Sequence, residues 1–269
     1  MSVPTIKPIL KYPGAKNALA PWIVSYLPRH VHYVEPFAGS LGVFLKKPRS
    51  RHEVVNDLSG DLVNLFRVIR ERGDDLAALV EMTPYSRVEY YASYESSDDP
   101  MERARRLLVR AWQAHGYKVC SRTGWRHNGS KSLQPVTSLW NNVPAAIRAT
   151  ALRLKDAEIE NIPALAVIER YQTADTLIYA DPPYVLSTRR NRKLYQHEMT
   201  DADHLALLDA LDAHPGPVVL SGYRCALYDD RLAHWQTVET QTQAEKGKAR
   251  IEALWLNARA AGAQQMRML

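Results

Sequence analysis

The 269-residue sequence has little cysteine and no long apolar run. Its two cysteines, Cys120 and Cys225, are too few for a disulfide framework, and neither has a His or Cys companion at the spacing of a zinc site. No segment approaches the roughly 20 apolar residues that a membrane-spanning helix needs. The N-terminal residues lack the apolar stretch and the small-residue cleavage site of a secretory signal. These absences predict a protein of the reducing cytoplasm, with structural thiols and no membrane partner.

The net charge of +6 is concentrated in one part of the chain. Between residues 100 and 131 there are eight basic residues and one acidic residue, Glu102, so this window carries +7 and the remainder is about neutral. A localised basic region on a neutral body is typical of a protein that binds a polyanion. A solvated helix face followed by a basic loop has the same composition and stays open as the alternative.

Short apolar segments that predict buried strands occur near both ends of the chain. They are residues 31–35, 53–56, 176–180, 217–221 and 251–256. A helix is predicted at 201–213, because Thr200 and Asp203 form a capping pattern before a periodic apolar series. The apolar positions of that series are Leu205, Leu208 and Leu211. Strands that alternate with helices predict a mostly parallel, doubly wound α/β sheet.

The segment 59–171 has a different pattern, with consecutive helices, a polar loop and no convincing strand pair. Asp99 and Pro100 predict the start of one helix, with Asp as the cap and Pro at the first position. An apolar stripe follows, with arginines on the opposite face: Ala104, Leu107, Leu108, Ala111 and Trp112. The polar stretch after His115 predicts an exposed loop or a hairpin around Asn128-Gly129.

The sequence therefore predicts two parts. Residues 1–58 and 172–269 form the sheet domain. Residues 59–171 form a mainly helical, basic insertion within it.

The clearest chemical signal is Asp181-Pro182-Pro183-Tyr184, which directly follows the apolar strand 176–180. Ligands of open α/β sheets lie beyond the carboxyl ends of the strands, where this tetrapeptide falls. The two prolines remove two amide donors and leave carbonyl oxygens free to accept hydrogen bonds. Asp181 and the carbonyl of Pro182 could then hold both hydrogens of an amino group, while Tyr184 offers a ring on which a planar base stacks. A proline-stiffened turn with a packed tyrosine is the structural alternative.

Phe37 and Gly39 form a second signal, in a turn at the end of the strand 31–35. A small residue after a strand lets the backbone approach a ligand closely. The G-x-G-x-x-G fingerprint is absent, so a nicotinamide dinucleotide enzyme is not predicted.

Asp57 follows the second strand, where nucleotide-type sites hold a ribose hydroxyl, although a helix cap is equally compatible with the sequence. Near the N-terminus, Tyr12 and Lys16 flank a Pro-Gly turn. That turn could close over an anionic ligand or simply precede a helix.

Together and in this order, these four segments resemble the Dam-type (D12 class) DNA adenine N6-methyltransferases. That family has an aromatic-x-Gly-x-Lys segment, a Pro-Phe-x-Gly turn, an Asn-Asp pair and a late Asp-Pro-Pro-Tyr. The later segments 203–204, 221–223 and 252–257 are also similar, and the resemblance covers about residues 8–72 and 174–258. It implies a Rossmann-like methyltransferase sheet interrupted by a DNA-recognition insertion. It also implies S-adenosyl-L-methionine as methyl donor, S-adenosyl-L-homocysteine as product, and no metal.

Matched by position, the resemblance implies a role for each motif residue. Asp181 would hold the target amino group with Pro182, and Tyr184 would stack on the base. The residues implied in cofactor binding are Tyr12, Lys16, Phe37, Gly39, Asp57 and Asp181, with Asp57 on the ribose. One position departs from the pattern, because Leu41 stands where the family usually has a second glycine.

The implied partner is double-stranded DNA, from which the target base must be flipped out. By residue type and charge, base edges are assigned to Arg122, Trp125, Arg126 and Asn128, with Trp125 as an alternative wedge in the duplex. Arg189 and Arg190 are assigned to phosphates beside the flipped base. A restriction endonuclease partner, the oligomeric state and the recognition sequence stay open, GATC being the family's commonest association.

Two further alternatives stay open at this stage. The same tetrapeptide could serve N4 of cytosine or an amino group in RNA. A relative that binds DNA without turnover would also have this fold, although the aromatic, lysine and two aspartate positions are all intact. The predicted location is the cytoplasm, in a bacterial or phage-encoded setting.

Overall fold

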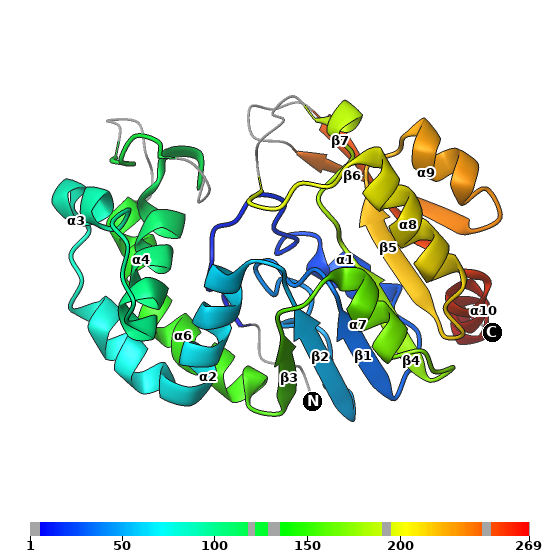
Figure 1. The fold of residues 1–269 in the computed structure, drawn as a ribbon, viewed down its shortest axis with the longest axis horizontal. Helices are drawn as coiled ribbons and strands as arrows, with labels where there is room; N and C mark the ends of the chain where they lie inside the picture. Colours follow the sequence, from blue (N-terminus) through cyan, green and yellow to red (C-terminus); the bar gives the residue numbers. More distant parts are fainter. Residues whose placement is uncertain (1–5, 118–121, 129–134, 190–194, 244–248, 269) are drawn as a thin grey trace.

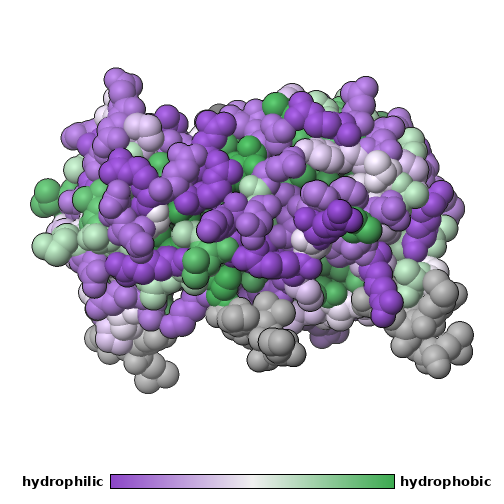
Figure 2. Space-filling view, turned by 90° about the horizontal axis from the view of Figure 1, so that it is seen from below, coloured by the Kyte–Doolittle hydropathy of each residue, from purple (hydrophilic) through white to green (hydrophobic). Residues whose placement is uncertain are grey.

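The computed structural model describes residues 6–117, 122–128, 135–189, 195–243 and 249–268. In these ranges the chain forms a sheet covered by helices, with a helical lobe beside it (Figure 1). No helix of the described chain is long and apolar enough to span a membrane. The face seen in Figure 2 is mostly hydrophilic, with hydrophobic residues scattered over it.

The described residues form a seven-stranded sheet with the order β3-β2-β1-β4-β5-β7-β6. Its strands are β1 His32–Glu35, β2 His52–Asn56, β3 Ala157–Glu160, β4 Thr176–Ala180, β5 Val218–Gly222, β6 Gln236–Gln243 and β7 Ala249–Leu256. The first five in spatial order run parallel, and β7 is antiparallel to both β5 and β6. The predicted mostly parallel α/β sheet is confirmed. Two strands, β3 and β6, were not predicted.

Helices cover both faces of this sheet. The helices are α1 Ala20–Ser25, α2 Gly60–Glu81, α3 Arg87–Ala92, α4 Pro100–Gln113, α5 Val136–Trp140, α6 Val143–Leu154, α7 Ala164–Arg170, α8 Asp201–Asp212, α9 Ala226–Arg231 and α10 Ala258–Met268. Two 3-10 helices, η1 His115–Tyr117 and η2 Leu186–Thr188, complete the described elements. In Figure 1, α2, α3, α4 and α6 form the lobe on the left, and α7, α8 and α9 lie over the sheet on the right.

Two apolar clusters fill the space on either side of the sheet. On β4, Leu177 and Tyr179 belong to the cluster that includes α1, α2, α4 and α6. Ile178 and Ala180 belong to the other cluster, with α7, α8 and α9. A strand that is buried on both faces needs an almost continuous apolar sequence, which is why these strands were recognisable.

The helical lobe ends earlier than the predicted insertion 59–171. β3 pairs in parallel with β2, so it is a strand of the main sheet. α7 packs against α8 on the face of that sheet. Residues 157–170, which the sequence analysis assigned to the insertion, thus include a strand of the main sheet and a helix on its face.

Three local predictions can be compared with the structure. The Asp99 side chain accepts hydrogen bonds from the backbone N–H groups of Met101 and Glu102, which confirms the start of α4. The capping box at the start of α8 is confirmed as well. The apolar series in α8 was partly wrong because Leu205 is exposed, and the buried face consists of His204, Leu207, Leu208 and Leu211.

The stretch predicted as an exposed loop or a hairpin around Asn128-Gly129 has one hairpin pairing in its described part. Ala114 and Trp125 form an isolated antiparallel bridge, supported by bonds from His115 N to Gly124 O (2.8 Å) and from Arg126 N to Gln113 O (2.7 Å). The pairing therefore encloses residues 116–123, and Asn128 follows it. Gly129 and Cys120 lie outside the described residues.

Candidate active site

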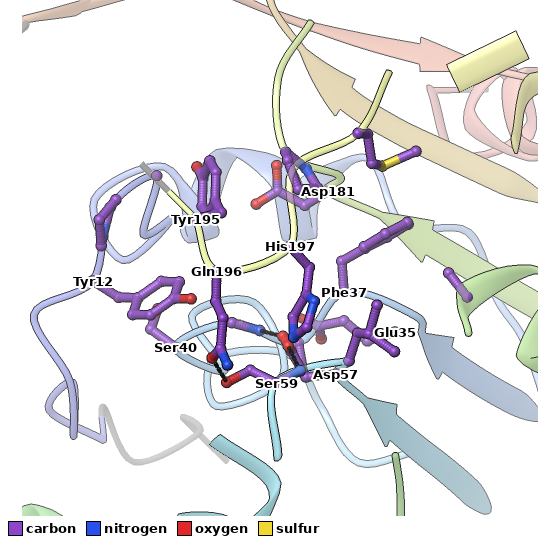
Figure 3. Close-up of a pocket in the computed structure, with 18 of the residues that line it drawn as sticks. Tyr12, Glu35, Phe37, Ser40, Asp57, Ser59, Asp181, Tyr195, Gln196 and His197 are labelled. Carbon is purple, nitrogen blue, oxygen red and sulfur yellow. Dashed lines mark hydrogen bonds between the residues drawn. The ribbon is translucent and has the colours of Figure 1, made fainter. Parts of the chain in front are cut away.

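A cavity of about 310 Å³ lies where the strands β1, β2 and β4 end (Figure 3). Its wall comes from five places in the chain: the N-terminal turn, the segments after β1, β2 and β3, and the segments after β4. The residues predicted to bind a cofactor all line it: Tyr12, Lys16, Phe37, Gly39, Asp57 and Asp181. The carboxyl edge of the sheet thus brings together side chains that are as much as 169 positions apart.

Asp57 ties the loop after β1 to the start of α2. One carboxylate oxygen accepts a hydrogen bond from Gly39 N (2.9 Å), and the other accepts one from Ser59 N (2.9 Å). Ser59 is the residue before α2, and its own side chain makes no cap bond. Burial raises the pKa of Asp57 above its usual value, although the Ser59 and Gly39 backbone N–H groups oppose the shift. Asp57 therefore holds the two loops together and presents its carboxylate to the cavity.

The loop after β1 has a left-handed backbone at two positions. Gly39 has φ +48°, which glycine adopts without strain, and Leu41 has φ +60°, which costs other residues energy. The Leu41 side chain is fully buried in the apolar cluster next to α1 and α2. Gly42 has the close contact, since a Cβ there would be 3.2–3.3 Å from backbone atoms of Lys16 and Asn17. Leu41 thus adopts a glycine-like conformation while its side chain fills the core.

Lys16 lines the cavity, and its ammonium is held by three groups of the protein. Its Nζ is 2.8 Å from Oδ1 of Asp181 and 3.4 Å from Oε1 of Glu252, and it donates to Gly14 O at 3.1 Å. Burial alone would lower the pKa of Lys16, but the Asp181 and Glu252 carboxylates outweigh it and raise the pKa above its usual value. Lys16 is therefore a buried, charged partner of the aspartate that was predicted to be catalytic.

Asp181 is mostly buried, with 17% of its side chain exposed. Burial raises its pKa to about 6, and the Lys16 ammonium opposes that rise. The carboxyl is therefore ionised at neutral pH and can accept hydrogen bonds. Figure 3 shows it facing the same cavity as Tyr195 and Phe37.

Tyr184 lies deeper than the prediction of a stacking residue suggested. Its ring is 7% exposed and its hydroxyl donates to Oε1 of Glu252. The Lys16 ammonium is 4.7 Å from the ring centroid, and Tyr223 packs against the ring edge-on at 4.4 Å. Pro182 is also buried, while Pro183 lines the cavity. The tetrapeptide is thus anchored by Tyr184 and presents Asp181 to the cavity.

The cavity also contains residues that the sequence analysis did not assign. Glu35, at the end of β1, accepts a hydrogen bond from the Tyr33 hydroxyl (2.7 Å), and burial raises the pKa of Glu35 to about 8. After β4, Gln196 approaches Ser59 with 3.2 Å between Oε1 and Oγ, and Tyr195 lies 6.3 Å from Tyr12 between ring centroids. Only Glu35 had a usable signal, as an acidic residue inside an apolar strand.

Two of the residues assigned to DNA lie on aromatic platforms of the helical lobe. Arg122 is exposed, and its guanidinium lies over the ring of Tyr91 at 4.7 Å. Trp125 is half-buried, with the Tyr85 ring at 5.7 Å and the Arg87 guanidinium over its face at 5.3 Å.

Other assigned residues have structural partners. Oδ1 of Asn128 accepts from Val136 N (2.8 Å) at the start of α5. The backbone carbonyl of Arg126 accepts from the Tyr85 hydroxyl (2.8 Å), and its side chain is half-buried. Arg189 forms an ion pair with Glu198, and its side chain is 4% exposed, so it stabilises the loop after β4 and is not placed to meet phosphates. Arg190 lies outside the described residues.

Part of the predicted +7 window is paired within the fold, with Asp61 and Glu89 as the acidic partners from outside it. The arginines of α4 pair with acidic residues of α2, α3 and α4 itself. The partners are Asp61 for Arg103, Glu89 and Glu102 for Arg105, and Glu102 for Arg106. Three of these arginines, Arg105, Arg106 and Arg110, are also only 13–17% exposed, so they serve the packing of the lobe.

Comparison with known proteins gives matches over most of the chain. Residues 12–244 match the profile of the D12 class N6 adenine-specific DNA methyltransferases. The type II methyltransferase M1.LlaDCHI of Lactococcus lactis subsp. cremoris is 26% identical over 273 residues, which cover 91% of this chain and 92% of that protein. The DNA adenine methylase of Serratia marcescens is 26% identical over 250 residues, covering 84% and 86%. Among solved structures, the rRNA methyltransferase aviRa from Streptomyces viridochromogenes is 12% identical, with coverage of 98% and 95% and a TM-score of 0.41.

Proposed function

Because this chain belongs to the D12 class N6 adenine-specific DNA methyltransferases, we propose a role for each part of the cavity. The cavity binds S-adenosyl-L-methionine, and Asp181 receives the N6 amino group of an adenine flipped out of duplex DNA. The observation that carries this proposal is that Asp57 and Asp181, from the ends of β2 and β4, open into one cavity. Since the family is adenine-specific, the cytosine and RNA alternatives are set aside.

The residues of the cavity fit a cationic nucleoside. Its volume of about 310 Å³ is in the range of small-molecule sites. Among the lining residues that carry charge at neutral pH, the carboxylates of Asp57, Asp181, Glu198 and Asp203 outnumber the Lys16 ammonium. Such a lining favours a ligand that carries positive charge. Asp57, with two backbone donors already on its oxygens, is oriented to accept further hydrogen bonds from ribose hydroxyls.

When bound, S-adenosylmethionine supplies an electrophilic methyl group on a sulfonium centre, so the protein's task is to orient the amine. Asp181 accepts one N–H of the amino group, and the carbonyl of Pro182 accepts the other. This pair of bonds directs the nitrogen lone pair away from the ring and toward the methyl carbon. The amine loses its surplus proton after transfer, to the Asp181 carboxylate or to solvent. With a pKa of about 6, Asp181 is ionised at neutral pH and can accept that proton.

We further propose that the helical lobe holds the DNA and that the enzyme acts in the cytoplasm, where bacterial or phage duplex DNA is found. Arg122 and Trp125 are the described residues best placed for contact, since both lie on the aromatic surface of α3 and the hairpin. A base extruded from the duplex then reaches Asp181, at a cost of a few kcal/mol for unstacking.

Two substitutions separate cofactor binding from chemistry. Asp57→Asn weakens the equilibrium binding of S-adenosylmethionine by roughly 10- to 100-fold, because one charged acceptor is lost. Asp181→Asn leaves that binding within a few-fold of wild type and lowers the single-turnover rate of methyl transfer to duplex DNA by at least roughly a hundredfold. Asp156→Asn, an exposed carboxylate paired with Arg49, is the control. Equal binding by wild type and Asp57→Asn would refute the assignment of the cavity.

A further inference from the structure

Two carboxylates from different strands share the Lys16 ammonium. Asp181 follows β4 and Glu252 lies on β7, with β5 between these strands. The Nζ atom of Lys16 is 2.8 Å from Asp181 Oδ1 and 3.4 Å from Glu252 Oε1. The side chains of Lys16 and Glu252 are 5% and 4% exposed, so both charges are removed from water. The resemblance assigned Lys16 to the cofactor, whereas Glu252 has no role assigned above.

The Lys16 ammonium occupies the hydrogen-bonding position that the target amino group requires. An ammonium and an amino group are both N–H donors, and Asp181 is the proposed acceptor of each. A target adenine therefore has to displace Lys16 from Asp181 before its amino group can be held there. A buried ammonium cannot simply lose its partner, because an uncompensated buried charge is strongly destabilising.

We propose that Glu252 is a positioning residue that receives the Lys16 ammonium when the target amino group takes its place at Asp181. This inference rests on the proposed function of Asp181. Glu252 already lies 3.4 Å from Nζ, so a small rotation of the flexible lysine side chain completes the transfer. Lys16 stays paired throughout, and the Asp181 carboxylate becomes available to substrate.

Further contacts hold Glu252 in place for this role. Its Oε1 accepts from the Tyr184 hydroxyl and lies 3.4 Å from Ser221 Oγ. Glu252 points to the same face of the sheet as Leu254 and Leu256, toward the N-terminal turn that carries Lys16. Because Tyr184 belongs to the same tetrapeptide as Asp181, Glu252 is linked to the catalytic loop by two routes.

A neutral residue at position 252 should lower the rate of methyl transfer, because it removes the second carboxylate partner of Lys16. In Glu252→Gln, Asp181 is the remaining one of the two carboxylates that contact Lys16. The target amino group therefore displaces the Lys16 ammonium from Asp181 less easily. We expect the single-turnover rate at saturating cofactor to fall roughly 10- to 100-fold, as for a misplaced reactive group. The equilibrium binding of S-adenosylmethionine should stay within a few-fold of wild type. Glu252→Asp keeps the charge and restores part of the rate.

The pH profile distinguishes this role from a structural one. The titratable and charged groups that face Asp181 are Lys16, Glu35, Tyr179, Tyr184, Tyr195, Tyr228 and Glu252. Loss of the negative charge at 252 removes a group that raises the pKa of Asp181. The acid limb of the rate profile should therefore move to lower pH in Glu252→Gln. Glu239→Gln is the control. It also removes one negative charge, from an exposed ion pair between Glu239 on β6 and Arg224, and should leave the pH dependence of the rate unchanged.

A double-mutant cycle gives the decisive result. With Lys16→Gln as background there is no ammonium to relocate, so adding Glu252→Gln should cost little further rate at saturating cofactor. Equal losses in the two backgrounds would overturn the proposal, as would a Glu252→Gln enzyme with the wild-type rate and profile. If Glu252→Gln does not fold, the same cycle is run with Glu252→Ala, which also removes the charge. Failure of the proposed function gives a different result from failure of the Glu252 proposal, because the wild-type enzyme would then transfer no methyl group to adenine.

Discussion

Lys16 and Asp181 form an ion pair of 2.8 Å at the bottom of the cavity, between residues 165 positions apart in the chain. The pair combines a lysine predicted to contact the cofactor with the aspartate predicted to hold the substrate. Lys16 therefore controls the protonation and the availability of Asp181. This relationship determines how the activity should depend on pH.

Methyl transfer should slow as the pH is lowered through about 6, where the Asp181 carboxylate takes up a proton. In Lys16→Met the positive charge that opposes burial is lost, so the pKa of Asp181 rises and the acid limb moves to higher pH. Single-turnover rates at saturating cofactor, measured from about pH 5 to about pH 9, test this. If the acid limb stays at the same pH in Lys16→Met, a group other than Asp181 determines the fall in rate.

Stability should depend on Glu35. Burial holds the pKa of Glu35 at about 8 in the folded protein, against 4.5 in the unfolded chain. Between these values the folded state keeps a proton that the unfolded state has lost, so the free energy of unfolding falls as the pH rises. Asp181 contributes in the same direction only up to about 6. Urea unfolding between those two folded-state pKa values should therefore show falling stability in wild type and a flatter dependence in Glu35→Gln.

Leu41 offers a test of backbone strain against burial. Leu41→Ala keeps the left-handed conformation and leaves a cavity, and should cost about 2–5 kcal/mol of unfolding free energy. Leu41→Gly leaves a similar cavity but relieves about 1–2 kcal/mol of left-handed strain. The glycine variant should therefore be more stable than the alanine variant, the reverse of the usual order. Chemical denaturation of both variants measures it, and an alanine variant that is the more stable one contradicts the assigned φ of +60°.

Arg122 is the exposed arginine through which DNA binding is best tested. Arg122→Ala should weaken binding to duplex DNA by about 1–3 kcal/mol, because the guanidinium that Tyr91 holds in position no longer contacts the DNA. Arg49→Ala is the control, because it also removes an arginine, a half-exposed one that pairs with Asp156. Fluorescence anisotropy at two salt concentrations measures both. Equal affinities for the two variants would remove Arg122 from the DNA surface.

The sequence predicted those parts of the fold that depend on local pattern. The strands at the centre of the sheet were visible as apolar runs because helices cover them on both sides. β3 alternates Ala157 and Ile159 with two glutamates, and β6 has the polar sequence QTVETQTQ, since each lies at an edge of the sheet. An edge strand has one strand neighbour and less apolar contact, so its sequence resembled a loop.

The site was predictable where it follows strand ends and unpredictable where it depends on pairing. Asp57 and Asp181 come directly after strands, and position alone brought them to one cavity. Glu252 has no such signal, because its contact with Lys16 joins opposite ends of the chain across β5. Composition assigned Arg189 to phosphates, but in the structure it pairs with Glu198, nine positions away, and its own side chain is 4% exposed.

The central claim is that this enzyme methylates N6 of adenine in duplex DNA through Asp181. We would map modified bases by long-read sequencing of a plasmid from a host without adenine methylation, expressing either the wild type or Asp181→Ala. The account predicts N6-methyladenine confined to one short sequence motif with the wild type and none with the variant. Methyladenine at the same motif with Asp181→Ala, or no methyladenine with the wild type, would contradict it.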